Sequence, residues 1–362
     1  MINQFCTSVP KLQRAWDSTS YNALLFCPRY YQLSIIDGWR TGVGNQHLEF
    51  GAYFASCVEA YKKGRVNGLS KEQGAILALR KAIVDTWVQD SGPWSGSFAH
   101  AWKCAGDKPY RNAAGNRAKC PYALTKTWLP EPHPDVCGTC GGSIVTEERW
   151  VTDYTKDRYA LVRLVAAYCD AQPENPEDGP FAISIGGTPA VELSFQYPIV
   201  LRTPDNEPYI LCGHLDSVVQ FGGERFIDDN KTTTKPLDQK YWAGYSPNTQ
   251  VDFYDFTGSV LWPDLDIRGV IIEGAQVLKS GEVRMGIGIM RRSEAQRLEF
   301  LNDIEYWLQQ AEIFATQDYW PMNRRNCWLC EFKDICAKEP DKRKMFLESN
   351  FVKRPWNPLE ER

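Results

Sequence analysis

The cysteines at the two ends of the chain place the strongest constraint on its fold. Cys327, Cys330 and Cys336 lie together in CWLCEFKDIC, and Cys27 lies in LLFCPRYYQL near the other end. A [4Fe-4S] cluster takes four thiolates, which one remote cysteine and a compact triplet can supply. The alternatives are a short zinc knuckle, or reduced cysteines packed as small apolar residues. If a cluster forms, it ties the two ends of the fold together.

The residues around Cys27 predict a thiolate at the end of a helix. Ser20 is a candidate cap for a short helix that runs to Phe26. Pro28 disfavours helical geometry at the residue before it. We therefore expect the helix to stop at Cys27.

The segment CGHLDSVVQFGGERFIDDNKTTT contains the residues with the clearest chemistry. Strand alternation places Asp229 and Lys231 on one face, and the turn at Gly222 and Gly223 lets the strand with Asp216 pair alongside. Two carboxylates and a lysine then converge, and such oxygen ligands suit Mg²⁺ or Mn²⁺. The metal would generate the attacking hydroxide, and Lys231 would hold the water and help to deprotonate it. The pattern predicts hydrolysis of phosphodiesters.

These three residues resemble the D…(D/E)xK signature of the PD-(D/E)XK nuclease superfamily. The segment SPNTQVDFYDF resembles the helix after the catalytic lysine in the RecB-like branch, which implies that Gln250 and Tyr254 position the lysine or the substrate. VELSFQYPI, with Glu192, resembles the first strand of that branch. One cysteine before the core and three after it resemble the iron-sulfur arrangement of AddB and the CRISPR-adaptation nucleases. The resemblance implies an α/β fold with a restriction-endonuclease-like core, in which helices flank a central mixed sheet.

The chain departs from this branch at one position. The helix before the sheet usually carries a metal-binding histidine in a GxxxH pattern, and in FGAYFASCVEAY this position is Ala55. Glu59, one turn further on, or His214, on the same strand face as Asp216, could complete the metal shell, and His47 is another substitute. The backbone carbonyl of Asn230 is a further candidate ligand. Glu59 could equally be solvated, since charged helix residues are mostly exposed.

A second cysteine group falls in a stretch rich in Gly, Pro and Lys. CGTCGG reads as a zinc knuckle, completed by an earlier pair of cysteines. Metal binding would supply folding energy that a region with little core of its own lacks. Alternative ligands are His100 and His133, and a metal-free loop is the remaining possibility. The predicted structural zinc ligands are Cys104, Cys120, Cys137 and Cys140.

These patterns divide the chain into four parts. Residues 1–95 form the N-terminal helical part with the first cluster cysteine, and residues 96–150 form the zinc-binding insertion. The nuclease core spans residues 151–320, and a cluster-binding segment and tail span residues 321–362. Strands are expected near residues 190–201, 208–220, 224–232, 268–278 and 282–291. Ser70 and Ser293 are predicted to cap helices, the first with Ile76, Leu79, Ile83 and Trp87 on one face.

Composition limits how the chain could contact nucleic acid. The 362 residues carry a net charge of −4, so no global basic field attracts DNA, and contacts must come from local patches. Candidate patches are Lys62, Lys63 and Arg65, then Arg291 with Arg292, and Arg324 with Arg325. No apolar leader or membrane-spanning run is evident, which predicts a cytoplasmic protein without a membrane partner.

The sequence therefore predicts a metal-dependent DNA nuclease, an exonuclease acting on DNA ends or single strands in recombination, repair or phage DNA metabolism. Its cofactors would be a [4Fe-4S] cluster, Mg²⁺ or Mn²⁺, and structural Zn²⁺. Nucleases of this type work with helicases, recombinases or integrases, so such a partner is expected. The alternatives are a CRISPR-adaptation-type nuclease, a DNA-end-binding scaffold that cuts poorly, or a structural metalloprotein in which both cysteine groups hold zinc.

Overall fold

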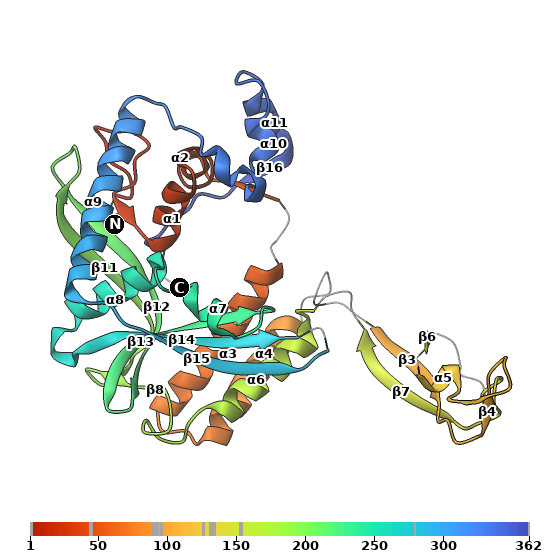
Figure 1. Cartoon of the computed structure of the whole chain (residues 1–362). Helices are drawn as coiled ribbons and strands as arrows, with labels where there is room; N and C mark the ends of the chain where they lie inside the picture. The colour runs from red at the N-terminus through yellow and green to blue at the C-terminus, as the bar shows by residue number, and fades with distance from the viewer. Residues whose placement is uncertain are drawn as a thin grey trace.

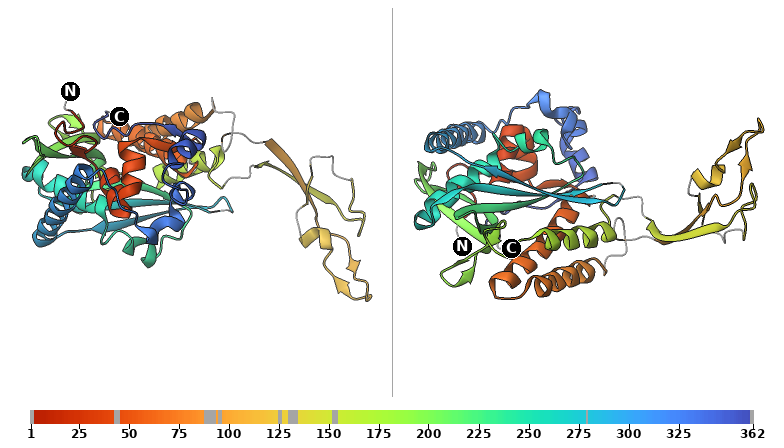
Figure 2. Two further views of the ribbon diagram at one scale, coloured as in Figure 1. Left: turned by 90° about the horizontal axis from the view of Figure 1, so that it is seen from above. Right: turned by 60° about the horizontal axis from the view of Figure 1, so that its bottom comes forward.

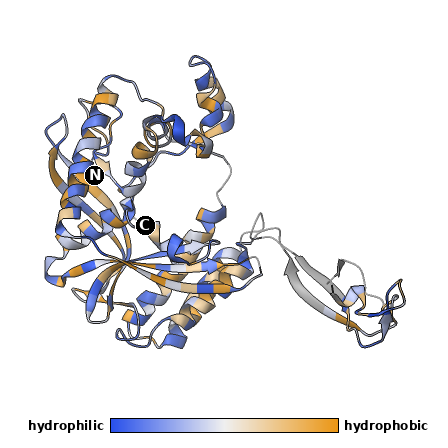
Figure 3. Cartoon of the chain, viewed as in Figure 1, coloured by the Kyte–Doolittle hydropathy of each residue, from blue (hydrophilic) through white to orange (hydrophobic). Residues whose placement is uncertain are grey.

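A computed structural model describes residues 3–42, 46–87, 94, 97–124, 127–129, 135–151, 155–278 and 280–360. A mixed central sheet with helices on both faces forms the main body, which confirms the predicted α/β class (Figure 1). Hydrophobic residues run along the strands of this sheet (Figure 3). None of the described helices is long and apolar enough to cross a membrane.

The sheet is built around one long strand, β12 (Pro208–Phe221). β11 (Val191–Arg202) and β13 (Glu224–Thr233) pair with it antiparallel, and the short β1 (Ala15–Trp16) pairs with it parallel. β14 (Ile267–Val277) runs parallel to β13, and β15 (Val283–Met290) is antiparallel to β14. Each end of the five strands from β11 to β15 lies within one residue of the predicted end. The short β8 (Phe181–Ala182) also pairs with β12.

Helices cover both faces of the sheet. On one face α3 (Gln46–Val66) and α6 (Arg158–Ala171) contact the strands, and α4 (Lys71–Trp87) packs on these two helices. On the other face α8 (Thr249–Leu261) contacts β13 and β14, and packs against α1 (Ser18–Phe26) and α9 (Glu294–Thr316). Figure 1 shows these two groups on opposite sides of the sheet. α8 joins the parallel strands β13 and β14, as expected for a crossover connection.

The remaining short elements lie between these. Two small helical pieces follow α1, and others surround α8 and the C-terminal segment. Their bounds are α2 Pro28–Tyr31, η1 Gln32–Ile36, α7 Gln239–Ala243, η3 Pro263–Leu265, η4 Arg324–Leu329, α10 Lys333–Cys336 and α11 Arg343–Asn350. Short strands are β2 Trp39–Thr41, β9 Ser184–Ile185, β10 Thr188–Pro189 and β16 Phe351–Lys353.

The caps of the two predicted helices are confirmed, but the cap of α1 is not the expected residue. Ser293 caps α9, and Ser70 exchanges hydrogen bonds with Gln73 at the start of α4. At α1 the N-cap is Asp17, whose carboxylate accepts the Ser20 backbone N–H at 2.9 Å. Ser20 occupies position N3 of the capping box, so the prediction that Ser20 caps this helix is wrong. The helix does end at Cys27.

Three of the four residues predicted for the apolar face of α4 are exposed, and Leu79 alone of the four is partly buried against the core. Ile76, Ile83 and Trp87 are 64%, 43% and 62% exposed, whereas the buried positions are Gly74, Ala78, Ala82 and Thr86. Small residues allow close helix packing: a Cβ on Gly74 would lie only 3.1 Å from the Tyr61 ring of α3. Periodicity alone could not show that α4 packs through its small residues.

The insertion between α4 and α6 forms its own small sheet. β3 (Ser97–Cys104) pairs with β6 (Thr127–Leu129) and β7 (Ile144–Val151), and β4 (Tyr110–Arg111) pairs with β5 (Arg117–Ala118). A short helix, α5 (Pro121–Leu124), lies among them. In Figures 1 and 2 these strands lie apart from the central sheet.

The two ends of the chain pack against each other. β2 pairs with β16, and Tyr30 makes an edge contact with Phe332 at a ring-centroid distance of 5.6 Å. Leu33, Phe332 and Leu347 share a small buried cluster. Figure 1 shows the first helices beside α10 and α11. The predicted closeness of the two terminal segments is confirmed, whether or not a metal cluster joins them.

Candidate active site

A break in strand pairing creates the candidate site. A strand has two edges, and β11 occupies one edge of β12 from Pro208 to Ser217. On the other edge β1 pairs with Ile210 and Leu211, and β13 pairs only from Ser217 onward. Residues 212–216 of that edge pair with neither strand, because β13 turns away to follow β14. A gap opens there between β12 and β13.

Asp216 and Asp229 lie where the two strands separate. Asp216 Oδ2 accepts a hydrogen bond of 2.8 Å from the Asn230 backbone N–H, so the carboxylate replaces the lost strand pairing. Lys231 Nζ donates to Asp229 Oδ1 at 2.9 Å and lies 2.7 Å from Oδ2. Asp229 is 2% exposed, and the Lys231 side chain is 30% exposed. The structure thus brings the three predicted catalytic residues together.

Two residues of α8 contact this group through Asp229, whereas the resemblance implied that they position the lysine or the substrate. Gln250 Nε2 lies 3.4 Å from Asp229 Oδ1 and donates to the Tyr254 hydroxyl at 2.9 Å. Tyr254 in turn donates to the His214 backbone carbonyl at 2.9 Å, which belongs to the unpaired edge of β12. Asn248 caps α8 by accepting the Gln250 and Val251 N–H groups, which sets the helix start. The Gln250 and Tyr254 side chains therefore connect Asp229 to β12.

These residues line one cavity of about 440 Å³. Ala55 and His47 of α3 and His214 of β12 lie in its wall. Ala55 therefore faces the cavity, and His47 and His214 lie in the same wall. His214 Nδ1 is 2.8 Å from Ser194 Oγ. The other predicted residues in the wall are Asp216, Asp229, Asn230, Lys231, Gln250 and Tyr254.

Glu59 is the predicted metal ligand that the structure does not bring to the site. Its carboxylate forms an ion pair with Lys63 at 2.7 Å, one turn along α3, and it is not part of the cavity wall. The wall is formed by Gly51, Ala52 and Ala55, on a different side of the helix. Glu59 fills the alternative role of a solvated ion-pair partner.

Two carboxylates from neighbouring strands lie in the wall of the cavity. Within the described residues, Asp229 Oδ2 is buried and accepts no hydrogen bond, since Lys231 reaches it without hydrogen-bond geometry. The Lys231 ammonium at 2.7 Å offsets the charge of this buried oxygen without making a hydrogen bond to it. Asp216 supplies a second carboxylate from the facing strand. Two carboxylates in an open cavity suit Mg²⁺ or Mn²⁺, which keep several waters.

Burial and neighbouring charges shift the titration of these groups. Burial raises the pKa of the Asp229 carboxyl to about 6, opposed by Lys231 and reinforced by Asp216. Burial acts against the charge on Lys231, but Asp229 and Asp216 outweigh it and raise the pKa of the ammonium. Lys231 is therefore a cation at neutral pH, able to donate hydrogen bonds to a water or a phosphate oxygen.

Behind the site lies a buried ionic network that the sequence reading missed. Lys62 Nζ contacts Asp228 Oδ2 and lies 2.9 Å from Glu273 Oε1, and Ser217 Oγ donates to Asp228 at 2.9 Å. Asp228 thus contacts a different set of side chains from Asp229, as strand alternation predicted. Lys62 follows Val58 by one helical turn on the buried stripe of α3, and that spacing was the available signal.

One ammonium cannot balance two buried carboxylates. Burial raises the pKa of the Asp228 carboxyl well above its ordinary value, with Lys62 opposing it. Burial also acts against the Glu273 carboxylate, but Lys62 outweighs it and lowers its pKa. The Asn230 side-chain amide joins this network to the site, at 3.3 Å from Asp228 Oδ2 and 3.4 Å from Asp216 Oδ2. The network therefore supports the position of Asp216.

Replacing Lys62 with methionine should destabilise the protein by about 3–5 kcal/mol, because the two carboxyls stay buried without their cation. The adjacent Lys63→Met is the matched control: Lys63 pairs with Glu59 at the half-exposed surface, and its loss should cost about 1 kcal/mol or less. Urea denaturation of the three proteins measures the difference. Equal midpoints for the two variants would show that the Lys62 network contributes little.

One residue in each of two predicted basic patches is buried. Lys62 is 3% exposed, and Arg292 is 9% exposed with its guanidinium on Asp252 at 2.5 Å. Arg291 remains at the surface but pairs with Glu224. Arg324 and Arg325 are exposed at the start of η4.

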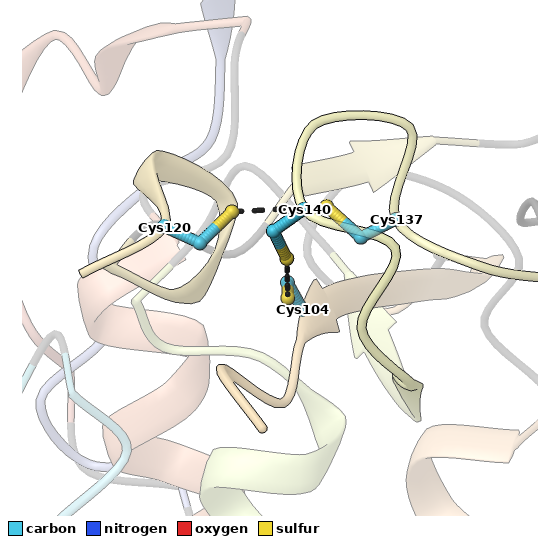
Figure 4. A group of neighbouring side chains, drawn as sticks. All are labelled: Cys104, Cys120, Cys137 and Cys140. Atoms are coloured by element: carbon cyan, nitrogen blue, oxygen red, sulfur yellow. Dashed lines mark hydrogen bonds between the residues drawn. The ribbon is translucent and has the colours of Figure 1, made fainter. Parts of the chain in front are cut away.

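The cysteines of the insertion form a tight group (Figure 4). The four Sγ atoms lie within 4.8 Å of one another, with 3.3 Å between Cys104 and Cys140 and 3.7 Å between Cys120 and Cys137. A Zn–S bond of about 2.3 Å places tetrahedral ligands about 3.8 Å apart. The group can bind a metal ion, and its spacing matches a single small cation. His133 lies outside the described residues.

Local backbone geometry brings these thiols together. The N–H groups of Thr139 and Cys140 lower the pKa of the Cys137 thiol to about 7, whereas burial raises the pKa of the Cys120 thiol beside it. At Gly142 a Cβ would lie 2.5 Å from Asp107 Oδ1 and 3.2 Å from the sulfurs of Cys104 and Cys140. Only glycine therefore fits beside the sulfurs.

The second cysteine group lines a single pocket between the terminal segments. Cys27 from the α1–α2 junction faces Cys327, Cys330 and Cys336 across this pocket. The Asn323 backbone N–H lies 3.2 Å from Cys27 Sγ. Burial raises the pKa of the Cys330 thiol to about 11. All twelve cysteines are free of disulfides.

The two cysteine groups differ in how closely their sulfurs approach. Across the described residues, the insertion cysteines are the one set of three or more candidate ligands gathered within single-ion distance. The terminal cysteines share a pocket without that closeness. The insertion cysteines are therefore the described group whose spacing could hold one metal ion.

Comparisons with known proteins do not identify a family. No family model matches the chain, and no curated protein matches it. Among solved structures, it is similar to a chain described as "Crystal structure of SSO0001", with 13% identity and a TM-score of 0.23. That match covers 41% of this chain and 59% of the other. A likeness this weak carries no argument about fold or function.

Proposed function

We propose that this chain is a divalent-metal-dependent DNA nuclease of the PD-(D/E)XK type, related to the RecB-like branch. The observation that carries the proposal is the group of Asp216, Asp229 and Lys231 at the separation of β12 and β13. Three residues chosen by sequence pattern meet in one cavity, with Gln250 and Tyr254 beside them. An incidental surface ion pair would not require this convergence.

The chemistry follows from what each group can donate or accept. Asp216 and Asp229 would hold Mg²⁺ or Mn²⁺, with His214 or His47 and the Asn230 carbonyl as further candidate ligands. Such an ion lowers the pKa of water and offsets charge on the phosphate. Lys231 is placed to orient the attacking water and to stabilise negative charge on the phosphate. Gln250 holds the Asp229 carboxylate in place.

Cleavage of end-labelled single- and double-stranded DNA with Mg²⁺ or Mn²⁺ tests this function, with a chelator as control. We expect metal-dependent shortening of at least one substrate. Folded, metal-loaded protein that binds DNA but cuts neither substrate would favour the DNA-end-binding scaffold. Ala55, which faces the cavity where the branch has a histidine, is the observation behind that alternative.

The biological setting follows only from the resemblance. A nuclease of this kind would act in recombination, repair or phage DNA metabolism, beside a helicase, recombinase or integrase. CRISPR adaptation is the other setting in which such a cysteine arrangement is found.

We further propose that Cys27, Cys327, Cys330 and Cys336 hold a [4Fe-4S] cluster and that the insertion holds structural zinc. Anaerobically purified protein should be brown, with broad absorbance at about 400 nm. Cys27→Ser should remove this absorbance while the zinc content stays at one per chain. A colourless protein with two zinc ions per chain would contradict the cluster.

A further inference from the structure

Lys156 is a buried cation beside the candidate active site, and the function proposed above does not use it. It lies just before α6 and is 3% exposed. Its Nζ donates to Thr232 Oγ1 at 3.0 Å and lies 5.2 Å from the centre of the Phe50 ring. Within the described residues, no carboxylate forms an ion pair with it. Burial lowers the pKa of Lys156 to about 8, which reflects the cost of an ammonium without a counter-ion.

The contact with Lys156 leaves the hydroxyl proton of Thr232 unused beside the cavity. An ammonium only donates hydrogen bonds, so Thr232 Oγ1 must accept from Lys156. A hydroxyl has one proton, and that proton is then free to point elsewhere. Thr232 lines the same cavity as Asp216 and Lys231. The cavity side of Thr232 is therefore a hydroxyl donor polarised by a buried positive charge.

The N-terminal end of α3 adds positive potential at the same place. Gln46, the first residue of this 21-residue helix, donates to the Lys156 carbonyl at 2.8 Å. His47, Leu48 and Gly51 from the first turns line the cavity. The positive end of a helix dipole favours anions. Glu49, in the same turn, is exposed and lies outside the cavity wall.

We propose that Thr232, Lys156 and the start of α3 form a phosphate-binding subsite for a nucleic-acid strand, next to the phosphate held by Asp216, Asp229 and Lys231. This inference rests on the proposed nuclease function and names a substrate-positioning site for it. Thr232 touches the phosphate, and Lys156 acts through Thr232. The buried ammonium, costly in the free protein, gains its counter-ion when the strand binds.

Strand affinity of four proteins tests the subsite: wild type, Lys156→Met, Thr232→Val and the double variant. Fluorescence anisotropy with labelled single-stranded DNA gives each Kd, with Ca²⁺ replacing Mg²⁺ because its longer, irregular coordination suits binding rather than catalysis. Each single variant should bind about tenfold or more weakly, the worth of one charge-assisted hydrogen bond. The double variant should bind no more weakly than either single one, because both remove the same contact.

Stability separates this role from a structural one. Lys156→Met removes an unpaired buried charge, so its urea midpoint should equal or exceed that of the wild type while its affinity falls. Lys81→Met, which removes a lysine paired with Asp85 on α4, should leave affinity unchanged. Affinities of the single variants within twofold of wild type, or effects that multiply in the double variant, would overturn the proposal.

Oligonucleotides with and without a 5′-phosphate show whether the subsite binds a terminal phosphate or an internal phosphodiester. If Lys156→Met weakens only a 5′-phosphorylated oligonucleotide, the subsite takes a terminal phosphate. If it weakens 5′-hydroxyl and 5′-phosphate strands equally, it takes an internal phosphodiester. Cleavage assays test the two proposals separately. If Lys156→Met cleaves DNA with the wild-type KM, the subsite proposal is wrong and the nuclease proposal stands. If the variants bind DNA more weakly than the wild type but no protein cleaves it, the nuclease proposal is wrong and the subsite proposal stands.

Discussion

Replacing Lys231 with methionine should reduce DNA cleavage by about 10²–10³-fold, the range expected for losing one donor that stabilises charge in the transition state. The ammonium lies 2.7–2.9 Å from both Asp229 oxygens, so it is placed to contact whatever those oxygens hold. Methionine keeps the length and apolar character of the stem without the charge. The loss should appear in kcat, measured with Mn²⁺ on end-labelled DNA.

Metal binding and folding should survive this change. The carboxylates of Asp216 and Asp229 remain, so Mn²⁺ should still bind by calorimetry, whereas Asp229→Asn should lose most of that binding. Lys240→Met, on the exposed side of α7, is the matched control and should cut like wild type. If folded Lys231→Met cleaves DNA as fast as the wild type, the lysine has no role in the reaction and the proposed mechanism is wrong.

Removing zinc should unfold the insertion and leave the central sheet intact. Beyond their sulfurs, the buried apolar cluster around Cys104, Cys120 and Cys137 contains few residues among those described. Structural zinc supplies about 10 kcal/mol or more to small modules of this kind. Cys137→Ser should therefore lose the zinc ion and expose residues 97–151 to protease.

Hydrogen exchange of the full chain measures this directly. Amides of β3 and β7 should lose protection in Cys137→Ser, whereas those of β12 and β13 should keep it. Cys6→Ala, outside both cysteine groups, should retain zinc and protection throughout. If the amides of the insertion stay protected from exchange after chelation, its strands fold without metal, which would favour the metal-free alternative.

Much of the secondary structure was predictable from local pattern. The five strands from β11 to β15 and the caps of α4 and α9 follow from alternation and from serine before an apolar run. The predictions for α1 and α4 were wrong where two local sequence patterns compete. Ser20 resembles a cap until Asp17 takes that position, and α4 has a large apolar stripe that competes with a row of small residues.

The sequence predicted the central residues of the candidate site but not which other residues surround them. Asp216, Asp229 and Lys231 were found by spacing, because strand alternation is the same in any sheet. Glu59 was assigned wrongly because helical spacing places it near Ala55 without showing which side faces the cavity. Lys156 could not be found, since its importance comes from Thr232 and from the start of α3, both distant in sequence.

By itself, the amino-acid sequence determined which residues could do chemistry: two acids and a lysine at strand spacing, and two groups of cysteines at metal-ligand spacing. Tertiary structure decided where that chemistry lies. β12 keeps β11 along one edge while β13 leaves the other edge to follow β14, and the resulting gap holds the acids. Long-range strand pairing and burial, which no local pattern encodes, determine the shape of that gap and the charges around it.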